Sequence, residues 1–230
     1  MNALAAVSAP EGIRHLVVLG HPDPDGFCGS MARTYRDTVR AFGQEATLRD
    51  LYTLGFDPAL KRDEIPRPGP HRKPATDIVE DLELLRQADV IVLVYPIWFG
   101  MPPAIVKGYV DRVLGAGFTA QDLKCGARHP VLHGKRLALI TSSASTRPWL
   151  EEKGQWIAHR QAFESYLQMV FSLRDGGHSH FDAIVPGLKQ RFVDENLAEV
   201  AEIATRHAAE LFEERRAADI ASARARAFAK

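Results

Sequence analysis

Two loops carry the residue types that could bind an anionic, aromatic ligand. In the first loop, from His21 to Cys28, Gly26 and Phe27 stand where a helix is expected to begin. Free backbone N–H groups at a helix N-terminus bind anions. The second loop, from Tyr95 to Pro103, holds three aromatic residues and three prolines in nine positions. It is expected to form a stiff apolar surface, so the two loops together suit a ligand with a phosphate at one end and a fused ring at the other.

Other ligand chemistries fit the spacing less well. The first loop matches neither the GxxxxGKS/T nor the GxGxxG pattern, which disfavours a nucleoside triphosphatase or a dinucleotide-binding Rossmann enzyme. Four residues separate Cys28 from Arg33, whereas a CxxxxxR phosphatase loop needs five, so a cysteine-dependent phosphatase is the less favoured alternative. The histidine pairs at 129/133 and 178/180 have no third ligand nearby in the sequence, and no metal site is predicted.

Composition narrows the class of protein. The 230 residues include 29 basic and 29 acidic side chains, so no net field favours nucleic acid or an anionic membrane. Two cysteines are too few for a disulfide framework and indicate a reducing, cytoplasmic compartment. The uncharged stretch 90–106 contains three prolines, which argues against an integral membrane helix.

Apolar runs alternate between strand-like and helix-like periodicity along the chain. This alternation predicts an α/β fold, in which a doubly wound, five-stranded parallel sheet of order 2-1-3-4-5 has helices on both faces. Residues 15–218 are expected to form one domain after a disordered lead-in (1–14) and before a C-terminal tail (219–230), and residues 57–74 are expected to be irregular. The expected strands are 15–20, 46–48, 89–94, 136–141 and 181–185, and the expected helices are 29–42, 78–85, 103–113, 156–171 and 193–216.

Four segments carry a family resemblance. They are LVVLGHPDPDGF from Leu16, ADVIVLVYPIWFGMPPAIVKGYVDRVL from Ala88, GKRLALITSS from Gly134 and HSHFDAIVPGL from His178. The chain resembles the flavodoxin-like NAD(P)H dehydrogenase (quinone) family, which includes FAD quinone reductases and FMN-binding potassium-efflux ancillary reductases. The resemblance extends over most of the chain to about residue 190 and implies a flavodoxin-like fold.

The resemblance also implies a set of cofactor-binding residues. His21, Gly26, Phe27 and Cys28 would hold the phosphate end of a flavin, although family members usually carry serine and asparagine in place of Gly26 and Cys28. The isoalloxazine ring would be lined by Pro96, Ile97, Trp98 and Phe99. Its pyrimidine edge would meet the loop from Thr141 to Leu150, in which Thr141, Ser142 and Ser143 are the expected cofactor-binding residues.

Two further residues are the predicted catalytic side chains. Trp149 stands where related enzymes often have a tyrosine, and its indole can only donate a hydrogen bond. Arg147 is the nearest candidate cation for an anionic reduced flavin.

These residues predict a flavin-dependent NAD(P)H oxidoreductase with a ping-pong mechanism. The nicotinamide would pass a hydride to bound FAD, or to FMN, and leave before a quinone or similar flat acceptor takes the same place. Relatives build the site between two subunits, so a homodimer is expected. The alternative from another class is a flavodoxin-like electron carrier, which usually has a strongly acidic face that this balanced sequence does not indicate.

Overall fold

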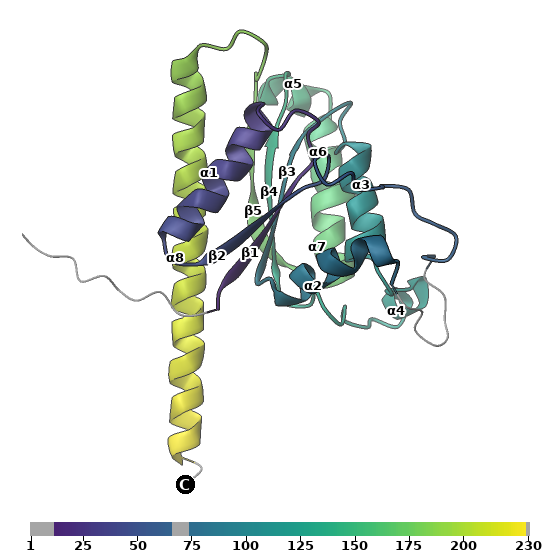
Figure 1. Cartoon of the computed structure of the whole chain (residues 1–230), viewed down its shortest axis with the longest axis vertical. Helices are drawn as coiled ribbons and strands as arrows, with labels where there is room; N and C mark the ends of the chain where they lie inside the picture. The colour runs from purple at the N-terminus through teal and green to yellow at the C-terminus, as the bar shows by residue number, and fades with distance from the viewer. Residues whose placement is uncertain (1–11, 66–73, 229–230) are drawn as a thin grey trace, which may run out of the picture.

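A five-stranded parallel sheet forms the centre of the protein in the computed structural model, which describes residues 12–65 and 74–228 (Figure 1). The strand order β2-β1-β3-β4-β5 confirms the predicted topology. All four neighbouring pairs are parallel, and Val17 of β1 lies between Leu48 of β2 and Val92 of β3. The strands are β1 (Arg14–Leu19), β2 (Glu45–Asp50), β3 (Val90–Pro96), β4 (Arg136–Ser142) and β5 (Arg174–Phe181).

Helices cover both faces of this sheet. In Figure 1, α1 and the long α8 lie on one face, and α2, α3, α6 and α7 lie on the other. The helices are α1 (Phe27–Ala41), α2 (Val79–Gln87), α3 (Ala104–Tyr109), α4 (Ala120–Lys124), α5 (Arg147–Glu152), α6 (Gln155–His159), α7 (Tyr166–Phe171) and α8 (Gln190–Phe228). A 3-10 turn, η1 (Thr76–Ile78), precedes α2, and π-helical turns η2 (Val110–Leu114) and η3 (Arg160–Ser165) follow α3 and α6.

The alternation of side chains along the strands produces two separate cores. Val92 and Val94 of β3 pack with α1 and α8, whereas Ile91 and Leu93 pack with the helices of the other face. Every residue of β3 is buried. A central parallel strand is covered on both sides, which explains its continuous apolar sequence.

Buried polar contacts attach α8 to the sheet. His15 of β1 contacts the Tyr35 hydroxyl at 3.0 Å, and that hydroxyl lies 3.0 Å from Nδ1 of His207 in α8. Gln44 contacts Nε2 of His15 and donates to the carbonyl of Ala208. Beyond these contacts, α8 extends past the edge of the sheet (Figure 1).

Three predicted boundaries were wrong. The fifth strand is Arg174–Phe181 rather than 181–185, because an edge strand can carry the polar and glycine residues that suggested a loop. The last helix runs from Gln190 to Phe228 instead of ending near residue 216, so residues 219–228 continue it. Most of the expected lead-in lies outside the described residues, but Ile13 is buried and Arg14 begins β1.

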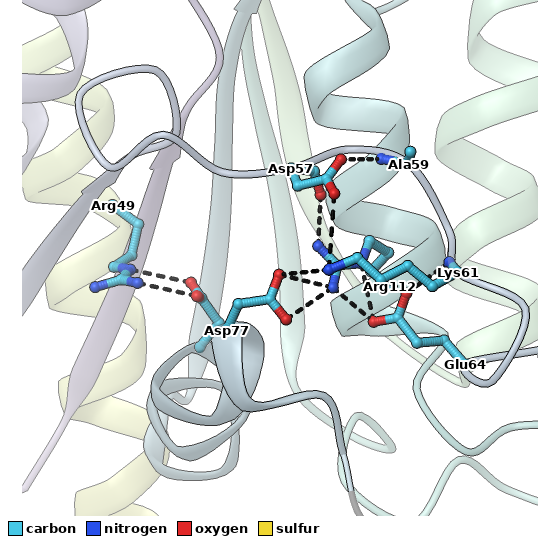
Figure 2. A network of polar contacts seen from close by, with 8 residues as sticks. Arg49, Asp57, Ala59, Lys61, Glu64, Asp77 and Arg112 are labelled. Atoms are coloured by element: carbon cyan, nitrogen blue, oxygen red, sulfur yellow. Dashed lines mark hydrogen bonds and ion pairs between the residues drawn. The ribbon is translucent and has the colours of Figure 1, made fainter.

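A buried arginine holds the segment 57–65 against α3 and η2. Arg112 of η2 forms hydrogen bonds with Glu64 at 2.6 Å and with Asp77 at 2.9 Å, and it also donates to the carbonyl of Asp57 (Figure 2). At Gly108 a Cβ atom would lie 2.3 Å from the carbonyl oxygen of Pro58, so this segment crosses α3 closely. Among the described residues, no helix is both long and apolar enough to cross a membrane.

Candidate active site

The carboxyl ends of β1 and β3 form a crevice because the chain leaves these neighbouring strands in opposite directions. After β1 it enters α1, which packs on one face of the sheet, and after β3 it enters α3 on the other face (Figure 1). Ligands of doubly wound sheets bind at such a point. The two loops singled out in the sequence meet here.

A cavity of about 860 Å³ occupies this position. Eleven of the thirteen predicted site residues line it: His21, Gly26, Phe27, Cys28, Pro96, Ile97, Trp98, Phe99, Ser142, Ser143 and Trp149. Ten other lining residues were not named individually from the sequence, although the first five lie in the three loops expected at the ligand: Asp23, Gly100, Ala144, Ser145, Leu150, Lys153, Gln155, Ile184, Val185 and Pro186. Of these, Gln155 and the residues 184–186 come from segments whose approach to the crevice depends on the tertiary fold.

One end of the cavity is the N-terminus of α1. Gly26 is the N-cap residue, and among the described residues no side chain forms a capping hydrogen bond there. The first turn of α1 contains no acidic residue, so its N–H groups and positive dipole end remain available to an anion. Gly29 allows the loop to fold back, because a Cβ at that position would lie 1.8 Å from the carbonyl oxygen of Pro24.

An acidic side chain stands beside this anion site. The carboxylate of Asp23 accepts a hydrogen bond from the backbone N–H of Asp25 at 3.0 Å, and a Cβ on Gly26 would lie 3.0 Å from its other oxygen. Nδ1 of His21 lies 2.9 Å from the Asp23 carbonyl oxygen. The backbone N–H groups of α1 therefore favour a bound anion, whereas the nearby Asp23 carboxylate disfavours it.

A rigid aromatic turn forms another part of the cavity wall. Trp98 and Met101 exchange two backbone hydrogen bonds of 3.0 Å, which leaves Phe99 and Gly100 in a two-residue turn with φ of 50° and 81°. Positive φ at both positions is the geometry of a tight hairpin turn. The turn is joined to β4 by the hydrogen bond from Ile97 N–H to the carbonyl of Ser142. Phe99 is fully exposed at its tip.

Cys28 does not have the environment of a reactive thiol. Its Sγ lies 3.3 Å from the Ser142 hydroxyl, and burial raises the pKa of the thiol to about 11. A nucleophilic cysteine requires a thiolate near neutral pH. The geometry therefore disfavours the phosphatase alternative.

Two predicted site residues, Thr141 and Arg147, are not among the lining residues in the described part of the chain. Thr141 is fully buried, and its hydroxyl contacts two histidines of β5. The Arg147 guanidinium lies 4.7 Å from the ring centroid of Trp156, and its Nε donates to Glu151. Trp149, by contrast, is half-exposed at the cavity. Within residues 12–65 and 74–228, no group of three His, Cys, Asp or Glu side chains is placed to hold a metal ion.

Comparison with known proteins assigns the chain to a family. Residues 13–207 match the family described as flavodoxin-like fold, and the chain belongs to that family. An uncharacterized NAD(P)H oxidoreductase of Haemophilus influenzae is 36% identical over 107 residues, which cover 46% of this chain and 52% of that protein. The human ribosyldihydronicotinamide dehydrogenase (quinone) is 28% identical over 159 residues, covering 62% of this chain and 68% of the relative. The matched segments thus span about half to two thirds of these curated relatives.

Comparison with a solved structure also supports the flavodoxin-like fold. The NAD(P)H:quinone oxidoreductase from Methanothermobacter marburgensis superposes with a TM-score of 0.72 at 20% identity. The superposition covers 84% of this chain and 98% of the other.

Proposed function

We propose that the protein is a flavin-dependent NAD(P)H oxidoreductase that reduces a quinone or a similar flat acceptor. The observation that carries this proposal is that the uncapped N-terminus of α1 and the aromatic turn 98–101 both line the same cavity. The names of the curated relatives, NAD(P)H oxidoreductase and ribosyldihydronicotinamide dehydrogenase (quinone), support it.

The residues of the cavity fit a flavin. A volume of about 860 Å³ lies within the range of small-molecule sites. The α1 N-terminus would bind the phosphate end of the cofactor, and the segment from Pro96 to Phe99 would line its ring. Ser142 and Ser143 supply hydroxyl groups at the carboxyl end of β4. These features suit FMN as well as FAD, and we propose FAD with FMN as the alternative.

The bound flavin would supply two-electron transfer between nicotinamide and acceptor, which is chemistry that cofactors perform. The residues of this chain would bind the flavin and orient the nicotinamide or the acceptor beside it. The turn 98–101 and Trp149 hold a flat ligand, and their apolar surfaces exclude water from it. Because one slot would serve both the nicotinamide and the acceptor in turn, we propose a ping-pong mechanism. We propose Trp149 and Arg147 as the catalytic side chains, of which Trp149 lines the cavity in the described part of the chain.

Anaerobic reduction of the reconstituted protein tests this function. The protein is loaded with FAD or FMN, and NADH or NADPH is added while the visible absorption of the flavin is recorded. We expect the absorption to bleach and to recover when menadione is added. A protein that retains neither flavin and oxidises neither nicotinamide would contradict the proposal.

The acidic side chain at the anion end gives a prediction about affinity. Asp23→Asn removes a negative charge but keeps the oxygen that accepts from Asp25 N–H. We expect the variant to bind FMN about 5-fold more tightly, which corresponds to about 1 kcal/mol for charges separated by a few ångströms near water. Isothermal titration with riboflavin, which has no phosphate, is the control and should give an unchanged affinity. Equal gains for both ligands would place the phosphate elsewhere.

We further propose that the protein is a homodimer in a cytoplasmic compartment. Four exposed apolar side chains line the cavity, Trp98, Phe99, Trp149 and Val185, and exposed apolar patches of this kind mark interfaces.

Phe99→Asn tests the interface without disturbing the turn, since asparagine tolerates positive φ and Asn-Gly favours this hairpin geometry. We expect the variant to dissociate at least about 10-fold more readily in sedimentation experiments, because interface aromatics contribute about 2 kcal/mol or more. Tyr52→Asn, at a half-exposed position in the turn after β2, should leave the oligomeric state unchanged. A monomeric wild-type protein would contradict the dimer.

A further inference from the structure

A continuous file of hydrogen-bonding side chains leads away from the cavity beneath β4 and β5. Ser143, which lines the cavity, lies 3.0 Å from Nε2 of His180. Nδ1 of His180 and Nε2 of His178 each lie 2.8 Å from the Thr141 hydroxyl. Nδ1 of His178 lies 2.9 Å from the carboxylate of Glu164 in η3. The five side chains thus connect the cavity to a buried carboxylate.

The single hydroxyl hydrogen of Ser143 limits how the hydrogens of these five side chains can be arranged. The Ser143 hydroxyl has a single hydrogen, yet it lies within reach of both His180 Nε2 and the carbonyl oxygen of Ser145, the latter at 2.7 Å. If it donates to His180, the remaining bonds are satisfied with both imidazoles neutral, each bearing its hydrogen on Nδ1. If it donates to Ser145, His180 must carry its hydrogen on Nε2. Thr141 must then donate to His180, and His178 must carry hydrogens on both nitrogens.

These two arrangements differ by one proton. In the first, Glu164 accepts from neutral His178, whereas in the second it accepts from a positively charged His178. Every hydrogen bond between the five side chains is formed in both arrangements, the direction of donation between His178 and Ser143 reverses, and only the bond from Ser143 to the Ser145 carbonyl is lost in the first. A buried network that is complete in two protonation states can carry a proton along its length.

We propose that Ser143, His180, Thr141, His178 and Glu164 form a proton relay that delivers one proton to an anionic group of the ligand bound in the cavity. This inference rests on the proposed function, because reduction of a quinone by two electrons requires protons as well. Ser143 is the member that touches the ligand, and the other four act through it.

In each transfer His178 loses one proton and the ligand gains one. Ser143 gives its hydroxyl proton to the anionic ligand and takes the proton from Nε2 of His180. His180 then takes the Thr141 proton at Nδ1, and Thr141 takes the proton from Nε2 of His178. His178 ends neutral, the ligand ends protonated, and no other bond changes. A proton from water restores the charged state before the next cycle.

The surroundings of the file disfavour a positive charge on His180 and on the neighbouring His159. Burial, followed by the charge of His178, lowers the pKa of His180 to about 4, and the same two causes lower the pKa of His159 to about 4. Burial opposes ionisation of Glu164, but its hydrogen bonds with His178 and Arg160 lower the pKa of its carboxyl below the ordinary value. Arg147 and Asp182 act on His180 with opposite signs.

Trp156 covers both histidines. Its ring centroid lies 4.8 Å from that of His178 and 5.1 Å from that of His180, and only 8% of the residue is exposed. An aromatic ring beside a cation stabilises the charge and excludes water from it. The His178 side chain is only 2% exposed, whereas His180 is half-buried, so the relay is most shielded from solvent at His178.

The tautomer of His180 provides a test that needs neither flavin nor activity. We expect imidazole nitrogen NMR shifts of the unloaded protein to show the hydrogen on Nδ1 of His180 at high pH and on Nε2 at low pH. The change of tautomer should accompany the uptake of one proton by the file. A His180 that keeps one tautomer across the pH range in which the protein stays folded would overturn the relay, whatever the result of the flavin experiments.

Thr141→Val keeps the shape of the side chain but removes the link. We expect His180 to keep one tautomer at every pH in this variant, because the link through the hydroxyl is lost, and Thr141→Ser to restore the coupling. In the loaded enzyme, Thr141→Val should lower the kcat of quinone reduction at least about 10-fold with an unchanged KM for the nicotinamide. The decline of the wild-type kcat at high pH should be absent. Retained coupling or an unchanged kcat pH profile in Thr141→Val would overturn the proposal.

Discussion

Replacing Arg112 with methionine is expected to lower the free energy of unfolding by about 3 kcal/mol at neutral pH, because removing one partner of a buried ion pair leaves the other charge uncompensated. The Arg112 side chain has no exposed surface, and only 8% of the Glu64 side chain is exposed. Urea denaturation monitored by circular dichroism measures the change. The carbonyl of Asp57 would also lose its donor, so the segment 57–65 should become more susceptible to proteolysis.

Arg86→Met is the matched control for this prediction. Its ion pair with Glu83 has both side chains about half exposed, and pairs of that kind contribute less than about 1 kcal/mol. A second variant, Arg112→Met combined with Glu64→Leu, removes both buried charges and should recover most of the lost stability. If Arg112→Met costs no more than Arg86→Met, the network in Figure 2 does not hold the segment in solution.

The strand order could be predicted because it depends on features that are local in the sequence. Apolar runs such as 89–94 alternate with amphipathic segments, and parallel strands joined by right-handed crossovers admit few arrangements. The position of β5 could not be found in the same way. Gly176 and Gly177 resemble a turn, and the strand pairs with β4 through an irregular register that only the packed sheet defines. The apolar residues Ile184 and Val185 lie after the strand, where Val185 and Pro186 close one side of the cavity.

Site residues could be predicted from the sequence where they come directly after a predicted strand. The loops after β1 and β3 and the end of β4 supplied ten of the eleven correctly predicted lining residues, since the carboxyl ends of parallel strands meet at one edge, and Trp149 of α5 is the eleventh. Asp23 lies within a predicted loop, and its charge was the signal that could have found it. Gln155 gave no such signal: it reaches the cavity because α6 starts beside Gly100, where a Cβ would lie 1.9 Å from its Oε1 atom. The relay was equally hidden, because His178 and His180 belong to the strand that was misplaced.

Gly29→Ala is the second change with a large expected effect. In the interior of a helix, alanine in place of glycine normally adds about 1 kcal/mol of stability. Here we expect the free energy of unfolding to fall by about 2 kcal/mol, as overpacking does, because the new Cβ would lie 1.8 Å from the Pro24 carbonyl oxygen. That oxygen cannot move without displacing the loop from His21 to Gly26. We therefore also expect flavin affinity to fall at least about 10-fold, since binding depends on the position of these backbone donors.

Helix propensity predicts that Gly29→Ala stabilises the protein, whereas the close approach of Pro24 predicts that it destabilises it, so the sign of the change tests the loop geometry. Ser30→Ala, one position further along α1, is the control, and its unfolding free energy should stay within about 0.5 kcal/mol of the wild type. Fluorescence quenching of added FMN, measured beside thermal unfolding of the unloaded protein, separates lost affinity from lost stability. If Gly29→Ala stabilised the protein and bound FMN normally, the close approach of Pro24 would not exist in solution. The N-terminus of α1 would then lack the fixed loop that aligns it with the aromatic turn, and a ligand gripped at both ends could not be explained by this cavity.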